Sequence, residues 1–487
     1  MKRLRSKVKS FKIETVEIEN PEVLRNHFHT LLEGEIGNLR EKLLNWYDAN
    51  KRDLQWRNLA KHVDQNIRGY SVLVSEIMLQ QTQVATVKSY YSKWIEKWPD
   101  FTALSKATLE EVNTVWSGLG YYSRGRRLYE AACKVVHEMD GTMPQTAEQL
   151  QKQLPGVGPY TAAAIGSIAF NERVGLVDGN VMRVISRLCS IGADTSKKSV
   201  VDVIWKLSNE MVDPDRPGDF NQAMMELGAT VCTPKSPLCQ VCPISLLCRA
   251  NKRAKQPEAF AACHMDIEDV PDCLLCLPID QPWVVKDGVT NYPRKAKKTA
   301  AKIARNIVLI IERTANESDS NEYLLWQRPV NGLLANLWEF PSFPSHHQWS
   351  DDLDKSRELT SAMDQLKGLL TGRDIERCQY MADVFHQFSH ISQTYGLYRV
   401  AVSACENAED DAVSLPDHYQ GFRWLNARQI AEAAISTAMK KVFRSFTQNA
   451  DGSSSSSLKR KAKSKETGTV SKKQMTLQSY FKSSQTE

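Results

Sequence analysis

The sequence predicts two folded domains of different class, an all-α domain followed by an α+β domain. From residue 36 to residue 250 the apolar positions recur almost entirely at helical spacing. Between residues 301 and 447, the strand-like runs NIVLIIER, EYLLWQRP and HISQTYGLYRVAV occur together with helical stretches, among them residues 351–370. The segment 251–300 carries prolines, scattered cysteines and a basic run, so we expect it to connect the two domains.

Both ends of the chain are expected to lie outside these domains. Residues 1–35 are charged and weakly patterned, and residues 448–487 begin with DGSSSSS, which is typical of a flexible linker. The net charge is only +6, but basic residues gather at MKRLRSKVK and KRKAKSK, which favours a nucleic-acid partner. No apolar run reaches about 18 residues, the length of a membrane span, so we expect no membrane-spanning helix. The N-terminus lacks the apolar segment of a secretion signal, so we do not expect secretion.

A glycine-rich turn at residues 154–159 is the most distinctive pattern in the helical domain. In LPGVGPYTA, Gly156 and Gly158 separate two helical stretches, and Pro159 is typical of the first turn of a helix. Glycines here permit positive φ and close backbone approach, so the free amides that begin the second helix can bind an anion such as a DNA phosphate. An ordinary corner between two helices is the alternative interpretation.

Two acidic residues lie next to apolar runs. Glu76 falls within one long helical stretch, residues 70–98, where apolar neighbours predict a raised pKa and a general acid near neutral pH. A solvent-facing glutamate is the alternative. Asp178, in LVDGNV, precedes a new helix, so we expect it to cap that helix and to stay ionised. An acid paired with an anion is what cleavage of a glycosidic bond uses.

Seven of the eleven cysteines fall between residues 232 and 276, which favours metal sites in a reducing compartment over disulfides. The first four have the spacing C-x6-C-x2-C-x5-C and are Cys232, Cys239, Cys242 and Cys248. Zinc sites usually contain two close pairs of ligands, whereas only one pair is close here, so we expect a 4Fe-4S cluster rather than zinc. Basic residues around the motif would face the DNA backbone.

Together these motifs resemble the helix-hairpin-helix DNA glycosylases that carry an iron–sulfur cluster, and among them the MutY family of adenine DNA glycosylases in its animal form. The resemblance rests on SEIMLQQTQV, GLGYYSRGRRL, LPGVGxYTA, DGNV and the cysteine spacing, and it covers most of residues 40–446. It implies a monomeric base-excision-repair enzyme that removes adenine mispaired with 8-oxoguanine, with guanine as a second candidate partner of the adenine.

The resemblance also implies roles for the residues of the catalytic site. Adenine is flipped out of the duplex, Glu76 protonates it at N7, and Asp178 stabilises the oxocarbenium-like state. Tyr160 and Asn180 support that centre and the attacking water. Relatives that also cut the strand carry a lysine at the place of Tyr160, as a Schiff base requires, so tyrosine there implies a monofunctional enzyme that leaves an abasic site.

Further residues match family positions that contact DNA. Gln81 and Tyr121 match positions that wedge into the duplex and contact the lesion; helix surface and core are the alternative interpretations. Arg52 and Arg57 match a basic pair near the adenine pocket. The departures from the family pattern are Gln55, where the family has proline, and Leu73, where tryptophan is common. Both residues lie beside the adenine pocket that the resemblance implies, so the sequence does not determine how that pocket is packed.

The domain from residue 301 to residue 447 resembles the Nudix-like lesion-reading domain of the same family, through GLLANLWEFPSF and QFSH. The sequence lacks the REx2EE cluster with which Nudix hydrolases bind magnesium, so we do not expect phosphate hydrolysis. The resemblance implies that Phe388, Ser389 and His390 stack beside the oxidised guanine and hydrogen-bond it. Taken alone, these three residues are typical of a structural loop.

The connector supplies three more thiols, Cys263, Cys273 and Cys276. The resemblance implies that a histidine from the N-terminal region, His29 or His27, completes a zinc site that orients the two domains. Free thiols are the alternative. We also expect the connector to be the segment that binds other repair and checkpoint proteins.

The last stretch of the chain, residues 474–481, resembles the sliding-clamp-binding box of replication and repair proteins. Its matching residues are Gln474, Leu477, Tyr480 and Phe481. In a short helical turn the apolar members fall on one side and form a hydrophobic plug. The basic run before the box resembles a nuclear localisation signal, and the basic start of the chain leaves mitochondrial targeting open.

Two other functions are open on the sequence alone. An endonuclease III-like bifunctional enzyme acting on oxidised pyrimidines would form a covalent adduct with DNA that borohydride traps. A non-enzymatic iron–sulfur protein, recruited by the clamp as a scaffold, would bind lesion duplexes and release no base.

Overall fold

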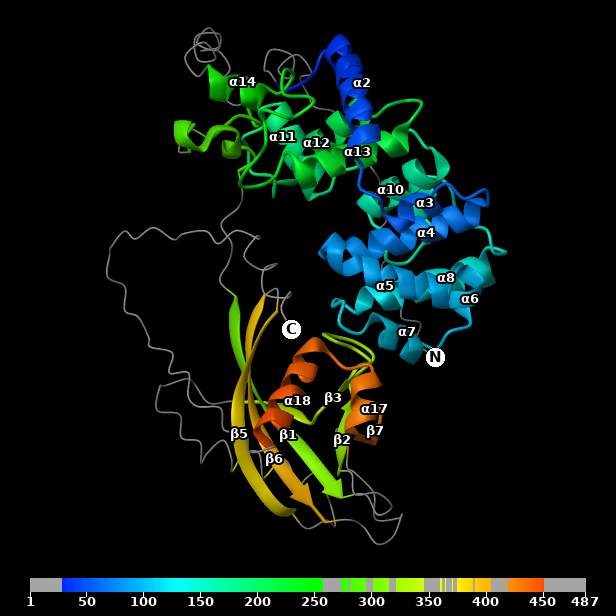
Figure 1. The fold of residues 1–487 in the computed structure, drawn as a ribbon, viewed down its shortest axis with the longest axis vertical. Coiled ribbons are helices and arrows are strands. Elements are labelled where there is room, and N and C mark those ends of the chain that lie inside the picture. Colours follow the sequence, from blue (N-terminus) through cyan, green and yellow to red (C-terminus); the bar gives the residue numbers. More distant parts are fainter. Residues whose placement is uncertain are drawn as a thin grey trace, which may run out of the picture.

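We analysed a computed structural model, which describes residues 29–256, 273–278, 281–294, 301–314, 321–345, 375–388, 390–403 and 419–450, with the single residues 360, 364, 370 and 415. The first part is entirely helical and the second contains a mixed β-sheet (Figure 1). The helical stretch expected at residues 351–370 lies almost wholly outside the described residues. No helix in the described ranges is long and apolar enough to cross a membrane.

The helical part is built on two hydrophobic cores. Its helices are α2 (Glu33–Asn50), α3 (Gln55–Leu59), α4 (Gln65–Leu79), α5 (Val84–Lys97), α6 (Phe101–Ser105), α7 (Leu109–Trp116), α8 (Ser123–Glu138), α9 (Ala147–Gln153), α10 (Pro159–Phe170), α11 (Gly179–Leu188), α12 (Lys198–Met211), α13 (Pro217–Thr230) and α14 (Arg249–Lys255). Helices α3 to α9 line the first core, which continues into the second domain through residues such as Trp338 and Ile435, and α2 packs with α11 to α13 around the second. Both groups are visible in Figure 1.

Helix α10 belongs to both cores. Ala162 and Ile165 are buried in the first core, and the adjacent Ala163 and Ala164 are buried in the second. Small side chains all round the helix let both groups of helices approach it closely. The catalytic candidates on α4, α10 and α11 therefore meet where the two cores join.

One expected helix is wrong. Residues 70–98 form two helices, because α4 ends at Leu79 and α5 begins at Val84. Gln81 in the intervening turn has φ of 54°, which no helix accommodates. The turn contains neither glycine nor proline, so local sequence gave no sign of it.

In its described residues, the second domain is a seven-stranded mixed sheet with two helices packed against it. Its elements are β1 (Lys302–Thr314), β2 (Asn321–Gln327), β3 (Trp338–Glu339), β4 (Ser342–Pro344), β5 (Ile375–Gln387), β6 (Ile391–Val402), β7 (Phe422–Asn426), α17 (Ala427–Glu432) and α18 (Thr437–Ala450). The main strand order is β3-β2-β1-β6-β5, in which only β1 and β6 are parallel, and β4 and β7 pair with β1 and β2. The expected strands at β1, β2 and β6 are present; β5 was not expected.

The two domains contact one another through α7, α8 and the loop between them. Ser117 Oγ and Tyr122 OH both donate to the carbonyl of Ile435, at 3.3 Å and 3.2 Å. Arg423 forms an ion pair with Glu110 on α7 at 2.6 Å. These contacts lie on the face of the helical domain that Figure 1 shows next to α17.

We expect Gly218→Ala to destabilise the helical domain. A Cβ at Gly218 would lie 2.6 Å from the carbonyl oxygen of Ser167 on α10, where only backbone could give way. The expected loss in the free energy of unfolding is about 1–3 kcal/mol, by overpacking. Gly37→Ala in α2 is the matched control, because nothing lies within 4 Å of its Cβ position, and it should stabilise by about 0.5–1 kcal/mol. Urea denaturation measures both, and equal effects would contradict the packing argument.

Candidate active site and DNA interface

Glu76 is a buried carboxyl in the last turn of α4, with 5% of its surface exposed. Tyr160 OH donates to its Oε2 at 2.5 Å. Burial raises the pKa of Glu76 to about 7; the hydrogen bond from Tyr160 opposes the rise and the nearby Asp178 adds to it. The expected raised pKa is confirmed, and the solvent-facing alternative is excluded by the burial.

Asp178 is the N-cap of α11, as its position before the helix predicted. Its Oδ1 accepts from the backbone amides of Asn180 at 2.9 Å and Val181 at 2.7 Å, and its Oδ2 accepts from the Asn180 side chain at 2.8 Å. Burial nevertheless raises the pKa of Asp178 above its ordinary value, and these hydrogen bonds oppose that rise. The cap geometry is as expected, whereas the direction of the net pKa shift is opposite to the one that capping alone would give.

Tyr160 connects the candidate acid to the helix that follows the glycine turn. Besides Glu76, its hydroxyl contacts the sulfur of Met225 at 3.3 Å. Burial and the neighbouring carboxylates of Glu76 and Asp178 raise the pKa of Tyr160 well above its ordinary value. The phenol is therefore a neutral hydrogen-bond donor at physiological pH.

Two residues that the sequence did not single out hold this group in place. Arg183 donates to Asn180 Oδ1 at 2.9 Å and to the carbonyls of Gly228 and Cys232 at 2.6 Å and 2.8 Å. It thereby fixes the side chain that hydrogen-bonds Asp178. Its position one helical turn after Asn180 was the only available signal.

The second such residue is Glu226, which lies 1% exposed on α13. It pairs with both arginines of the expected basic pair, at 2.5 Å from Arg52 Nε and 2.8 Å from Arg57 NH2. The charge of Arg57 acts on Glu76 and lowers its pKa, which places this arginine near the candidate acid. The departures from the family pattern are accommodated: Leu73 is fully buried, and exposed Gln55 accepts from Ser92 Oγ at 2.7 Å.

The glycine turn joins α9 and α10 as expected for a helix-hairpin-helix element. Gly156 has φ of 81°, whereas Gly158 is the N-cap of α10 with φ of −91°, so the expected positive φ holds for Gly156 alone. Nothing lies within 4 Å of a Cβ built on Gly158, which leaves its backbone open to a ligand. A surface hollow at this turn is lined by Gln80, Arg127, Gly156, Val157, Gly158, Pro159, Tyr160 and Thr161.

The two candidate wedge residues lie on exposed loops. Gln81 is exposed in the turn between α4 and α5, and Tyr121 is 45% exposed just before α8. The alternatives of helix surface for Gln81 and core for Tyr121 are excluded by these positions.

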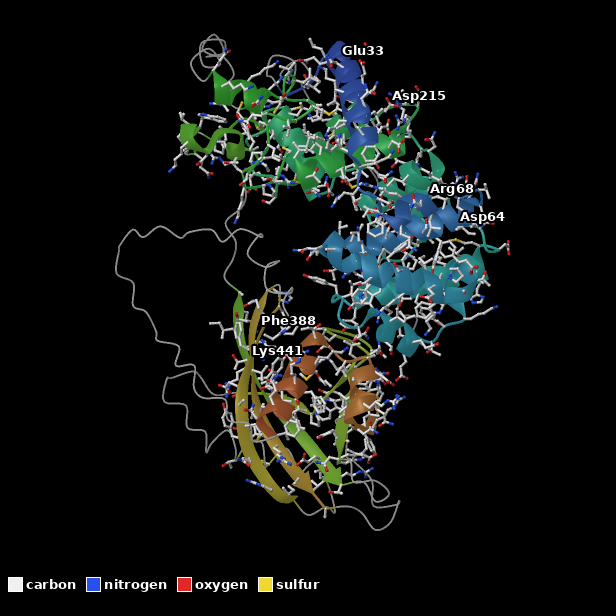
Figure 2. All side chains as sticks on the ribbon, in the orientation of Figure 1. Glu33, Asp64, Arg68, Asp215, Phe388 and Lys441 are labelled. Atoms are coloured by element: carbon white, nitrogen blue, oxygen red, sulfur yellow. The ribbon has the colours of Figure 1, made fainter. Side chains whose placement is uncertain are left out.

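Two of the three candidate lesion-reading residues, Phe388 and His390, lie at the tip of the β5–β6 hairpin. Phe388 follows β5 and forms an edge-to-face contact with His386, with ring centroids 4.5 Å apart. His390 precedes β6, and Ser389 lies outside the described residues. Figure 2 shows Phe388 at the end of the sheet nearest the helical domain.

The four cysteines of the first motif line one cavity. Cys232, Cys239, Cys242 and Cys248 surround it together with Arg187, whose NH1 donates to Cys232 Sγ at 3.3 Å. All four are free of disulfides. Thiols gathered from one loop around a shared space suit a metal centre.

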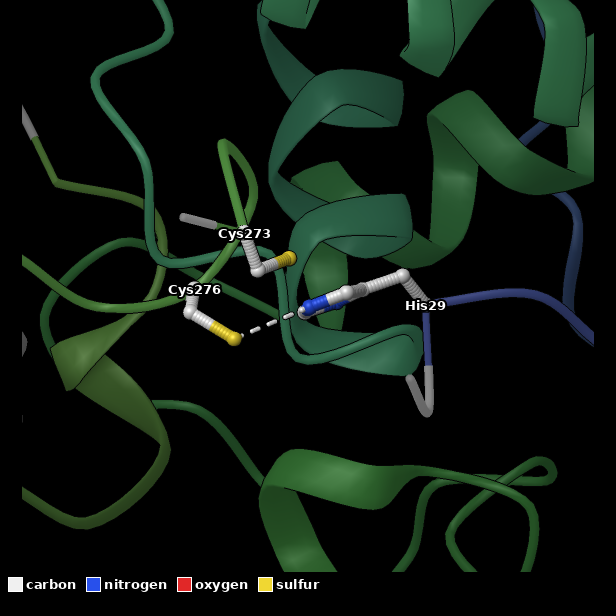
Figure 3. A group of neighbouring side chains, drawn as sticks. All are labelled: His29, Cys273 and Cys276. Atoms are coloured by element: carbon white, nitrogen blue, oxygen red, sulfur yellow. Dashed lines mark hydrogen bonds between the residues drawn. The ribbon is translucent and has the colours of Figure 1, made fainter. Parts of the chain in front are cut away.

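A second thiol group lies where the connector meets the N-terminal segment. His29, Cys273 and Cys276 are the only group of three potential ligands in the described ranges whose donor atoms all lie within 4.8 Å of one another. His29 Nε2 is 3.3 Å from Cys276 Sγ, and its Nδ1 is 2.9 Å from the carbonyl of Cys189 (Figure 3). His27 and Cys263 lie outside the described residues.

The raised pKa of Glu76 predicts a specific dependence of stability on pH. Between its ordinary pKa of 4.5 and the folded value of about 7, the folded protein holds a proton that the unfolded chain has lost, so this contribution is complete below 4.5 and is lost as pH rises through about 7. We expect Glu76→Gln to become progressively more stable than the parent across that range. Urea denaturation at several pH values measures it, with surface Glu138→Gln as the control, and a constant difference would contradict the assignment.

Comparison with known proteins places this geometry in a family. Residues 74–210 match the family model of the HhH-GPD superfamily of base excision DNA repair proteins, and residues 314–445 match the NUDIX domain. Among solved structures, a thermostable thymine-DNA glycosylase is 27% identical, covering 45% of this chain and 98% of its own at a TM-score of 0.39. The C-terminal domain of mouse MUTYH, solved with human PCNA, is 29% identical, covering 30% and 90% at a TM-score of 0.24.

Curated relatives match over most of the chain. The adenine DNA glycosylase of Mus musculus is 48% identical, covering 85% of this chain and 78% of its own. Those of Homo sapiens and Schizosaccharomyces pombe are 47% and 40% identical, covering 85% and 77% of this chain and 74% and 84% of their own. The chain therefore belongs to the adenine DNA glycosylase family.

Proposed function

We propose that this chain is a monofunctional adenine DNA glycosylase of base-excision repair that acts on adenine opposite 8-oxoguanine. The observation that carries the proposal is the buried Glu76, hydrogen-bonded by Tyr160 and lying near Asp178, in a chain of this family. A carboxyl with a pKa of about 7 can give a proton to a base at physiological pH, and a second carboxylate can stabilise the cation that remains.

The proposed reaction begins when the extruded adenine enters the site. Glu76 protonates its N7, which turns the base into a better leaving group. The glycosidic bond then breaks towards an oxocarbenium-like state, near which the hydrogen-bonded carboxylate of Asp178 is held. Asn180 and Tyr160 orient the two carboxyl groups. Water then adds to the sugar carbon from which adenine has left and gives its proton to the ionised Glu76, which restores the acid. No amine takes part, so the product is an abasic site on an intact strand.

DNA is proposed to be held by three parts of the molecule. The open backbone of Gly158 and the amides that begin α10 face a phosphate at the hairpin. Gln81 and Tyr121 enter the duplex, and Arg52 and Arg57 border the adenine pocket. The hairpin tip with Phe388, Ser389 and His390 contacts the oxidised guanine from the second domain.

Two metal centres are proposed, and the donor groups fit them differently. The cysteines around the Arg187 cavity do not include three sulfur atoms within 4.8 Å of one another in the described ranges, which favours a 4Fe-4S cluster over a single zinc ion, whose ligands lie about 4 Å apart. His29, Cys273 and Cys276 are close enough for zinc, with Cys263 as the proposed fourth ligand. The Cys189 carbonyl orients the histidine ring. The cluster and the zinc supply structural support for the DNA-binding elements.

The proposed partners besides DNA are a sliding clamp and other repair and checkpoint proteins. The clamp would take the hydrophobic plug of residues 474–481, which lies outside the described residues. The adjacent basic run supports a nuclear location, and the connector is the proposed contact for other repair and checkpoint proteins.

Base release is expected from A:8-oxoguanine duplexes, and more slowly from A:G, with none from T:8-oxoguanine or A:T. Glu76→Gln should lower the single-turnover rate by about 10²–10⁴-fold, because the proton donor is lost. The parent rate should fall as pH rises above about 7, as Glu76 loses its proton. Borohydride should trap no covalent adduct. Full activity in Glu76→Gln would overturn the acid assignment, and a robust adduct would overturn the monofunctional one.

The two metal centres are expected to be separable by mutation. Replacing Cys273 and Cys276 with serine should remove about one zinc per chain and leave iron unchanged, because the ligand sets do not overlap. Cys242→Ser should remove iron. Metal analysis measures both, and Cys378→Ser, in β5 away from either group, is the control. Loss of iron from the Cys273 and Cys276 variant without loss of zinc would contradict the assignment.

Clamp binding is expected to depend on the aromatic end of the box. Replacing Tyr480 and Phe481 with alanine should weaken binding to a purified sliding clamp about tenfold or more, since the plug is lost, while base release is unchanged. Calorimetric titration measures the affinity, with Lys482→Ala as the control. Unchanged affinity would rule out this segment as the clamp contact.

A further inference from the structure

Gln81 and Tyr121 are two of the residues other than glycine that the helical domain holds in the left-handed region, besides Asp140, Asn171 and Ser190. Gln81 has φ of 54° in the turn after α4, and Tyr121 has φ of 48° in the loop before α8. Side chains disfavour this conformation, and it persists only where the surroundings over-determine it. The two loops are 40 residues apart in sequence, so local sequence alone does not relate them.

One buried side chain contacts both loops. Arg124 on α8 is 6% exposed. Its NH1 donates to the carbonyls of Ile77, Met78 and Gln80 at 3.0, 2.9 and 2.5 Å, and its NH2 donates to Thr82 Oγ1 at 3.2 Å. The residues on either side of Gln81 are thus both bound to this guanidinium.

The same guanidinium binds the loop that carries Tyr121. NH2 donates to the carbonyls of Leu119 and Gly120 at 3.4 and 3.0 Å, and Nε lies 3.4 Å from the carbonyl of Tyr121 itself. The centre of the guanidinium also lies 5.3 Å from the Tyr121 ring. Arg124 is therefore the shared partner of the two left-handed residues.

The partners of Arg124 explain why arginine occupies this position. Ile77 and Met78 supply carbonyls from the last turn of α4, which lack partners within the helix and form the negative end of its dipole. No carboxylate pairs with Arg124 in the part of the chain that the structure describes. Burial lowers its pKa to about 10, so it stays charged at neutral pH. A planar fork of five donors can serve two loops at once, which a lysine ammonium cannot.

We propose that Arg124 is a positioning residue that fixes Gln81 and Tyr121 relative to one another, so that both enter the duplex together. The proposal rests on the proposed function, and it adds a residue that touches neither the base nor the phosphate. Loss of the guanidinium frees each loop from its left-handed conformation, and the two side chains no longer share a fixed spacing.

A double-mutant cycle on DNA binding tests this role. The probe is a duplex in which 8-oxoguanine faces a 2′-fluoro-adenosine that cannot be hydrolysed, and fluorescence anisotropy gives Kd. Tyr121→Ala should weaken binding about tenfold or more in the parent and about threefold or less in Arg124→Met, because Tyr121 is already misplaced there. Equal factors in the two backgrounds would show that Arg124 does not act through Tyr121 and would overturn the proposal.

The matched control is Arg40→Met. Arg40 on α2 likewise donates to three carbonyls at the C-terminal end of a helix, those of Glu210, Met211 and Val212 at the end of α12, but it lies away from both loops. Its loss should lower thermal stability, and the effect of Tyr121→Ala should be unchanged in its presence. If Arg40→Met diminished the effect of Tyr121→Ala as much as Arg124→Met does, the coupling would reflect a general loosening of the fold. That result would overturn the proposal.

Two further measurements keep the outcome decisive. If circular dichroism shows that Arg124→Met is unfolded, Arg124→Lys takes its place in the cycle, with the same two expected factors. The parent is assayed for adenine release from the hydrolysable A:8-oxoguanine duplex. If the parent released no adenine, the proposed function would be refuted, but the binding cycle could still be interpreted. If the parent released adenine and Tyr121→Ala weakened binding equally in both backgrounds, only the positioning role would be refuted.

Discussion

The site depends on the burial of one carboxyl, that of Glu76, between two hydrophobic cores. A buried carboxylate without partners is costly, so the fold favours the protonated form and supplies a hydroxyl, that of Tyr160, at 2.5 Å. Glu76 is on α4 in the first core, and Tyr160 is on α10, which packs against both cores. The same contact therefore sets the proton affinity of the acid and ties it to the helix after the hairpin.

The two carboxyl groups near this junction, those of Glu76 and Asp178, occupy different positions along their helices. Asp178 begins α11, where backbone amides and the positive end of the helix dipole stabilise its charge. Glu76 lies in the last turn of α4, where every amide is used by the helix itself. Burial raises both pKa values, but only Asp178 has amides to oppose the rise. Position along a helix thus separates an acid from an anion.

Local patterns predicted those features whose cause is local. The sequence signals for the cap at Asp178, the turn at Gly156 and the apolar surroundings of Glu76 each lie within about ten residues of the feature. Glu226 could not be found that way, because its partners Arg52 and Arg57 are 174 and 169 residues away. The turn at Gln81 was missed because its left-handed conformation is imposed by a distant arginine rather than by glycine. Strand β5 was missed because this edge strand carries many polar side chains.

Helix α13 carries none of the residues proposed to act on the base, yet it fixes several that do. Met225 contacts the Tyr160 hydroxyl, Glu226 holds the arginine pair, and the carbonyl of Gly228 accepts from Arg183. A Cβ on Gly228 would lie 2.7 Å from the Cβ of Asn180, so a glycine here is what lets α13 approach α11. These contacts come from three residues within one turn of the same helix. A shift of α13 would therefore move Tyr160, the arginine pair and Arg183, which supports Asp178 through Asn180, together.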